Sequence, residues 1–218
     1  MLKHHLKFLA YLILSISFSS ALAGAYEDYF KTSINDDSST VSGLLARGFD
    51  PNSRDEKGQN LLYLSQRDGA NKVAQVLLDH PQLRIDLPNS AGETALMMAA
   101  LRDQDTWVAK MLDKGASIDG TAEAGKPGWT PLHYAAASPG TRALQVLLAR
   151  GARVDARSPN GTTPLMMAAQ YGSEDAVNAL LKQGADVRLR NDLNLGPVEF
   201  AQRGGREALV TRLAALAR

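Results

Sequence analysis

Apolar residues recur along this chain in short blocks that are spaced almost evenly. One block carries glycine, threonine, leucine and two adjacent alanines at matching places, and it has three copies: Gly92–Ala100, Gly128–Ala136 and Gly161–Ala169. A second apolar block follows each copy and ends in a glycine-alanine pair, which begins at Gly115, Gly151 and Gly184. This pattern predicts two helices and a turn in each copy.

The repeat period is 33 residues, which is the distance from Gly128 to Gly161 and from Pro164 to Pro197. Weaker copies flank the clear ones: residues 44–48 close a first unit, and new units open at residues 58 and 194. Insertions of one and three residues lie in connecting segments, where extra length is tolerated. A fixed period of this length indicates a stacked array in which each unit buries its apolar face against the next.

The segment Thr130–Ala135 reads TPLHYA and reproduces the TPLHxA signature of ankyrin repeats. The chain resembles that family over about residues 40–215. The resemblance implies an all-α solenoid of five to six helix-turn-helix units, joined by β-hairpin-like finger loops and closed by atypical caps. The predicted units are an N-terminal cap at 24–53, four repeats at 54–86, 87–119, 120–155 and 156–187, and a C-terminal cap at 188–218.

Local chemistry supports this interpretation. Thr130 and Thr163 stand where a side-chain oxygen can cap a helix, and a proline follows each of them at the first helical position. The glycines that close the second helices are expected to adopt a left-handed backbone. His133 is similar to a family histidine that bonds the connecting loop, and we expect this bond to be lost where Tyr63, Met97 and Met166 replace it. Six leucines are expected to fill the space between layers: Leu96, Leu112, Leu132, Leu148, Leu165 and Leu181.

The first residues have the order of a secretory signal peptide. Lys3 and Lys7 precede an apolar stretch of about 11 residues and a run of small residues. That stretch is shorter than the roughly 20 residues that span a bilayer. We therefore expect residues 1–23 to be removed, with cleavage after Ala23 or Ala25, and we expect the protein to be periplasmic, with secretion as the alternative.

Charge and cysteine content narrow the function classes. The chain has no cysteine, which excludes disulfides and thiolate chemistry. Loss of residues 1–23 lowers the 24 basic residues to 22 and leaves the 23 acidic ones, a balance that argues against nucleic-acid binding. Residues 24–60 hold seven acids against four bases, whereas residues 188–218 hold six arginines against three acids. These ends are either solvated caps or the source of a field that steers a polar partner.

No arrangement of residues predicts catalysis. Beyond residue 23 the histidines are His80, before a proline, and His133, in the signature, so neither a metal pair nor a catalytic base is expected. The segment 191–194 resembles part of a calcium loop but lacks the central glycine and the downstream glutamate. We predict a protein that is not an enzyme, with no cofactor, no metal, no small-molecule substrate and no membrane contact after processing.

The family resemblance implies that partners contact the finger tips and the exposed ends of the first helices. The finger candidates are Lys57, Gln59, Glu93, Lys126, Trp129, Asn160 and Thr162. The first-helix candidates are Arg67, Asp68, Leu101, Arg102, Ser138, Gln170 and Tyr171. Trp129 has two alternative roles, as a binding hot spot or as a cover for the longer finger.

Three functions fit these features. The first is a periplasmic module that binds a specific protein, as an inhibitor or immunity protein. The second is a stress-associated helper or scaffold that supports an envelope enzyme, with a secreted effector of a host protein as a further alternative. The third is an enzyme with a dispersed site using Glu93 or Asp103, which no paired spacing of carboxylates supports.

Overall fold

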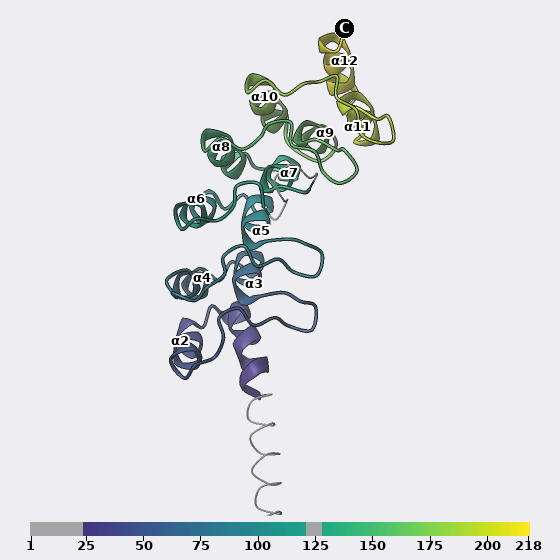
Figure 1. Cartoon of the computed structure of the whole chain (residues 1–218). Coiled ribbons are helices and arrows are strands. Elements are labelled where there is room, and N and C mark those ends of the chain that lie inside the picture. The colour runs from purple at the N-terminus through teal and green to yellow at the C-terminus, as the bar shows by residue number, and fades with distance from the viewer. Residues whose placement is uncertain (1–23, 121–127) are drawn as a thin grey trace, which may run out of the picture.

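Helices stacked in pairs along one axis make up the chain, in a computed structural model that describes residues 24–120 and 128–218 (Figure 1). A helical segment over residues 24–35 comes first. It is followed by α2 (Ser38–Ala46), α3 (Leu61–Asp68), α4 (Asn71–Leu78), α5 (Ala95–Leu101), α6 (Asp105–Asp113), α7 (Pro131–Ala137), α8 (Arg142–Ala149), α9 (Pro164–Gln170), α10 (Glu174–Lys182), α11 (Pro197–Arg203) and α12 (Glu207–Leu216). The described residues thus form six helix pairs, and one pair lies in each unit named above.

The odd-numbered helices pack against one another as an inner column, and the even-numbered helices form an outer column (Figure 1). The inner column runs α3, α5, α7, α9 and α11 through contacts between successive members. The connecting fingers project beside it, on the side away from the outer helices. We call the surface made by the fingers and the exposed ends of the inner helices the inner surface.

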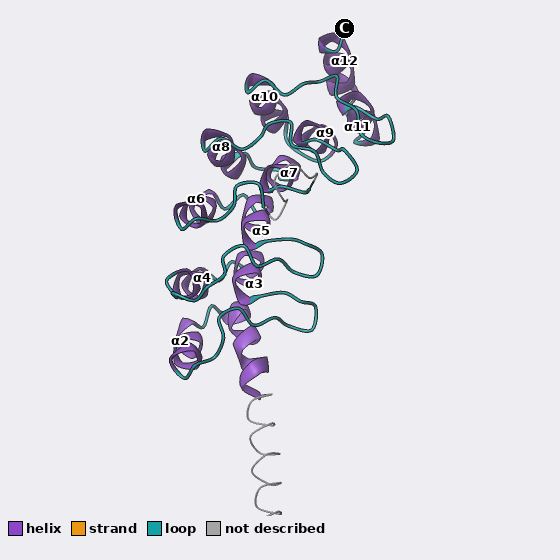
Figure 2. Cartoon of the chain, viewed as in Figure 1, coloured by secondary structure: helices purple, strands orange, loops and turns teal. Residues whose placement is uncertain are grey.

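The fingers are hairpin-like without being strands (Figure 2). In the described part of the chain, bridging is limited to the isolated pair Arg54 and Asn60. Four fingers close by one bond from a backbone N–H to the carbonyl four residues on, at Asp55, Asn89, Ser158 and Asn191, with N–O distances of 2.8–2.9 Å. The residue at the turn has a positive φ in each of them: Gly58, Gly92, Gly161 and Asn194. Glycine and asparagine are favoured there, because most other side chains are strained in this conformation.

The predicted helix ends are confirmed with one change. The Thr163 side chain accepts the Met166 amide at 3.4 Å. Thr130 instead holds its Oγ1 2.9 Å from Nδ1 of His133. The helix-closing glycines all have left-handed φ values, 91° at Gly115, 85° at Gly151 and 87° at Gly184.

The core is a continuous column of apolar side chains between the layers. Leu96, Leu132 and Leu165 of the inner helices are at most 1% exposed, as predicted. The expectation for the outer helices is wrong by one residue: Leu112, Leu148 and Leu181 are only partly buried. The fully buried side chains are those just before them, Met111, Leu147 and Leu180. The first of the two apolar residues faces the inner column, and the second lies at its margin.

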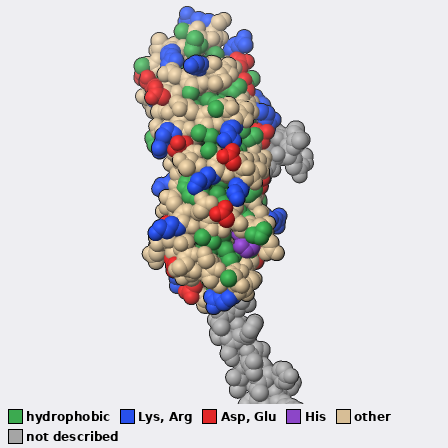
Figure 3. Space-filling model, turned by 90° about the vertical axis from the view of Figure 1, so that its left-hand side faces the viewer, with side chains coloured by type: hydrophobic (Ala, Val, Ile, Leu, Met, Phe, Trp, Pro, Cys, Tyr) green, Lys and Arg blue, Asp and Glu red, His purple; other side chains and the backbone are tan. Residues whose placement is uncertain are grey.

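The outer column presents a mixed charged surface. Figure 3 looks onto this face and shows basic and acidic side chains interspersed along its length. None of the helices in residues 24–120 and 128–218 has the length and apolarity to cross a membrane. The predicted signal peptide, residues 1–23, lies outside the described residues.

Candidate protein-binding surface

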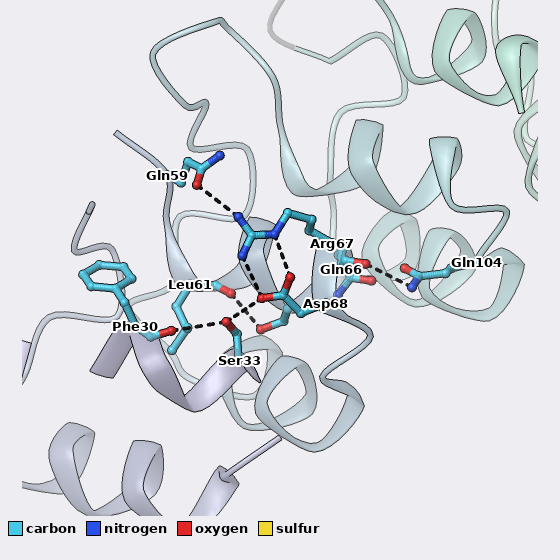
Figure 4. A network of polar contacts seen from close by, with 9 residues as sticks. Phe30, Ser33, Gln59, Leu61, Gln66, Arg67, Asp68 and Gln104 are labelled. Atoms are coloured by element: carbon cyan, nitrogen blue, oxygen red, sulfur yellow. Dashed lines mark hydrogen bonds and ion pairs between the residues drawn. The ribbon is translucent and has the colours of Figure 1, made fainter. Parts of the chain in front are cut away.

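Three predicted residues, Gln59, Arg67 and Asp68, meet at the N-terminal end of the inner surface (Figure 4). Nε and Nη2 of Arg67 donate to the two carboxylate oxygens of Asp68 at 2.6 and 2.9 Å, and Nη1 reaches Oε1 of Gln59 at 3.4 Å. Ser33 donates to the same Asp68 carboxylate at 2.8 Å. The Arg67 hydrogen bond lowers the pKa of Asp68. Lys57 is exposed on the adjoining finger, so this corner combines an ion pair with a cation that has no ion pair among the described residues.

Glu93 is partly buried, and neighbouring side chains engage its carboxylate. Its carboxylate accepts the hydroxyls of Tyr63 at 2.8 Å and Tyr134 at 2.9 Å, and the Asn89 amide at 2.8 Å. Burial alone would raise the pKa of Glu93, but these hydrogen bonds outweigh it and lower the pKa. Glu93 therefore fixes the finger 87–94 between α3 and α7.

The Tyr63 contact corrects one expectation and adds two residues to the site. Tyr63 stands in the histidine position of its unit, yet its hydroxyl still bonds the next finger through Glu93. Neither Tyr63 nor Tyr134 was predicted to act here. A tyrosine in the histidine column, followed one repeat later by a glutamate after the finger glycine, is the signal that would have found this contact.

His133 makes the corresponding bond in the next unit, as the resemblance implied. Its Nε2 lies 3.0 Å from the carbonyl oxygen of Thr162. Burial lowers the pKa of His133 to about 4, so the ring is neutral near pH 7. Trp129 is half-buried and sets its indole edge-on to this imidazole, with 5.2 Å between ring centroids. Residues 121–127 of the longer finger lie outside the described residues, so both predicted roles of Trp129 stay predictions.

The remaining predicted residues divide by exposure. Arg102 and Asn160 are exposed, and Tyr171 is 59% exposed, whereas Leu101 and Gln170 are partly buried. The predicted surface position of Ser138 and Thr162 is wrong, because they are 1% and 2% exposed and lie in the interior. The Thr162 hydroxyl faces the interior, where the Asn191 side-chain amide donates to it at 3.5 Å. Lys126 lies outside the described residues.

A groove of about 790 Å³ opens at the same end of the inner surface. It lies between the helical segment 24–35, the finger around residue 57 and the middle and last turn of α3. Its apolar lining comes from Tyr26, Phe30, Ile34 and Leu64. Sequence reasoning missed it because the first unit lacks the threonine signature that marks the other units.

Within residues 24–120 and 128–218, no group of three or more histidine, cysteine, aspartate or glutamate side chains is arranged to hold a metal ion. What the inner surface does offer is hydrogen-bonded fingers and helix ends with exposed aromatic, cationic and amide side chains. Such composition suits protein interfaces, where a few aromatic and guanidinium groups supply much of the affinity.

Stacked helix pairs with projecting fingers define a repeat scaffold of the protein-binding class. The family model for ankyrin repeats in three copies matches residues 30–122 and 120–191, and the chain belongs to the ankyrin-repeat family. Ankyrin repeats mediate protein–protein interactions and are generally not catalytic, so a protein partner follows from the family.

Curated relatives share the repeats within much longer chains. The human transient receptor potential cation channel subfamily A member 1 is 30% identical over 112 residues, which is 51% of this chain and 10% of the channel. The chicken nuclear factor NF-kappa-B p105 subunit is 31% identical over 125 residues, 56% of this chain and 12% of that protein. The chain therefore spans only about a tenth of the length of these relatives.

Among solved structures, a chain in the complex of the predatory endopeptidase Bd0816 from Bdellovibrio bacteriovorus with immunity protein Bd3460 has a similar fold. The TM-score is 0.70 at 24% identity, and the match covers 88% of this chain and 96% of that one. At this identity the likeness concerns the fold.

Proposed function

We propose that this protein is exported to the periplasm, loses residues 1–23 there, and binds one specific protein through its inner surface as an inhibitor or immunity protein. The observation that carries the proposal is the inner surface itself. Glu93 and His133 fix two of its fingers, and three exposed side chains without an ion pair among the described residues lie on the same surface: Lys57 on another finger, and Arg102 and Tyr171 at the ends of inner helices. Preformed loops lose little conformational freedom on binding, which favours tight capture.

We favour inhibition of an enzyme over support of one because of the similarity in fold to a solved complex. The solved complex with a similar fold pairs a predatory endopeptidase with an immunity protein, and the similarity extends over nearly the whole of both chains. The presence of a chain with this fold in a complex of an enzyme with its immunity protein favours the interpretation that the present protein restrains an envelope enzyme. Because the identity is 24%, the nature of that enzyme does not carry over.

The test is affinity capture from a periplasmic extract of the source organism. The bait is the exported protein, beside a variant with Lys57→Ala, Arg102→Ala and Tyr171→Ala. A control variant carries Lys72→Ala, Gln145→Ala and Lys182→Ala, which are exposed positions on the outer helices α4, α8 and α10. We expect one protein to be retained by the parent and by the control but released by the inner-surface variant.

The activity of the retained protein shows whether this chain inhibits it or supports it. Inhibition predicts that its activity falls when the purified parent is added and recovers with the inner-surface variant. A rise in activity would replace the inhibitor by the helper. Retention that is the same for all three baits would refute the inner surface as the binding site.

A further inference from the structure

The groove at the N-terminal end carries the most exposed large apolar side chain among the described residues. Ile34 is 72% exposed, and Tyr26 beside it is 39% exposed. Leu64, only 3% exposed, lines the same groove from α3. Contiguous exposed apolar surface in a folded domain marks an interaction site more often than chance. The volume of about 790 Å³ falls in the range of pockets that receive several side chains or a small ligand.

Contacts between the first helical segment and the chain beyond it hold the groove open. The Tyr26 hydroxyl donates to the backbone carbonyl of Arg54, and the Tyr29 hydroxyl donates to that of Pro51 at 3.2 Å. The rings of Tyr26 and Phe30 meet edge to face, with centroids 5.1 Å apart. The walls are therefore fixed before any partner arrives.

The charges around the groove are not balanced once internal pairs are removed. Lys31 pairs with Glu27 at 2.9 Å, and Arg67 pairs with Asp68. On the finger, Asp55 and Glu56 have no ion pair in the described chain, although the Asp55 carboxylate accepts the backbone amides of Lys57 and Gln59 and interacts electrostatically with Arg67. Of the cations that line the groove, Lys57 is the one without an ion pair among the described residues. The unit around them is acidic as a whole, with seven acids against four bases in residues 24–60. A cationic group on the partner would therefore complement the charge of this rim.

We infer that the groove anchors an extended segment of the protein partner in which an apolar side chain stands directly beside an arginine or lysine. The apolar side chain fills the space between Phe30, Ile34 and Leu64, and its cationic neighbour faces Asp55 and Glu56. The inference rests on the proposed function, since it names the chemistry by which the same inner surface selects its partner. An apolar groove with acidic residues at its rim discriminates between partner segments. A segment with an acidic residue next to its apolar side chain is repelled by the rim.

The probes are two blocked pentapeptides, Gly-Ser-Leu-Arg-Gly and Gly-Ser-Leu-Glu-Gly, titrated into the exported protein while the methyl groups of Ile34 and Leu64 are followed by NMR. We expect the arginine peptide to shift both methyl groups and to bind about fivefold more tightly than the glutamate peptide at low salt. Glu56→Gln should reduce that preference. Ile34→Glu should abolish binding of both peptides, and because Ile34 is exposed this change leaves the core intact.

A matched control is Leu193→Glu, which introduces the same charge at a leucine that is 69% exposed and lies on the last finger. It should bind both peptides as the parent does. Equal affinity for the two peptides, or binding that survives Ile34→Glu, would overturn the inference. So would concentration-dependent self-association that Ile34→Glu removes, because a second copy would then be the occupant.

The same variants separate this inference from the proposed function. If the parent captures a partner and Ile34→Glu captures it with equal affinity, the groove is not the anchor, although the inner surface still binds. If the parent captures nothing, the proposed function fails, and the peptide titration alone decides whether the groove has the stated preference.

Discussion

The outer and inner surfaces join neighbouring repeats by different chemistry. On the outer helices the links are exposed ion pairs, such as Lys114 with Asp79 at 3.2 Å and Arg150 with Asp113 at 2.8 Å, whose side chains are 43–63% exposed. On the inner surface the links are His133, fully buried, and Glu93, partly buried. Exposed pairs contribute little, because water and salt screen them, whereas a buried polar group that loses its partner is costly. The shape of the binding surface therefore depends on a few interior hydrogen bonds.

The largest effect is expected for His133→Ala. The change leaves a cavity and removes the bond to the Thr162 carbonyl, so we expect the free energy of unfolding to fall by about 3–4 kcal/mol. Urea denaturation followed by circular dichroism measures this loss. His80→Ala, in a loop outside the inner surface, is the control and should cost less than about 0.5 kcal/mol. Equal losses for both variants would erase the contrast between interior and surface histidines.

Acidification should act through the same side chain. The pKa of His133 is lowered to about 4 in the folded state from 6.5, so the unfolded state binds more protons between these values. Stability supplied by the neutral ring is present above pH 6.5 and is lost as the pH falls through 4, by about 3 kcal/mol in all. Urea midpoints measured across this range for the parent and for His133→Gln test it. The same slope in both would assign the pH dependence to other groups.

Glu93→Ala should have an intermediate effect. It leaves the hydroxyls of Tyr63 and Tyr134 and the Asn89 amide without their shared acceptor. Because the site is partly open to water, we expect a loss of about 1–2 kcal/mol, with faster hydrogen exchange in the finger 87–94. Exchange measured by mass spectrometry reports on that finger directly. If its rate is unchanged, Glu93 does not fix the finger.

The smallest effect is expected for the outer ion pairs. Lys114→Ala should lower the free energy of unfolding by less than about 0.5 kcal/mol, and raising the salt concentration should make the difference vanish. Thermal unfolding at low and high salt gives both values. A loss as large as that of Glu93→Ala would remove the distinction between the two surfaces.

The stacking of the helix pairs could be predicted because each unit repeats the same short sequence pattern at a constant spacing. The 33-residue spacing, the finger glycines and the helix-closing glycines specify the units without reference to distant residues. Equivalent positions in the repeats do not predict which side chains are buried. Glu93 and Thr162 both follow a finger glycine, yet Glu93 is partly buried beneath two tyrosines and Thr162 is 2% exposed.

Contacts between units were harder to foresee than the units themselves. Tyr134 and Glu93 are 41 residues apart, more than one period, so a comparison of equivalent positions does not pair them. The groove was missed for a related reason. It is built where a finger meets a first unit without the signature, and its apolar wall comes from a segment that the repeat pattern does not describe.

The carboxylate of Glu93 has a consequence for how the array comes apart. Repeat arrays behave as one-dimensional chains whose stability is a sum over units and neighbouring interfaces, so they can fray from either end. The Glu93 carboxylate accepts hydrogen bonds from Tyr63 in the preceding unit and from Tyr134 in the following unit. Three consecutive units therefore share one stabilising contact. Units 54–86, 87–119 and 120–155 should therefore open together as one cooperative block, and the acidic first unit and the arginine-rich last unit should unfold before it.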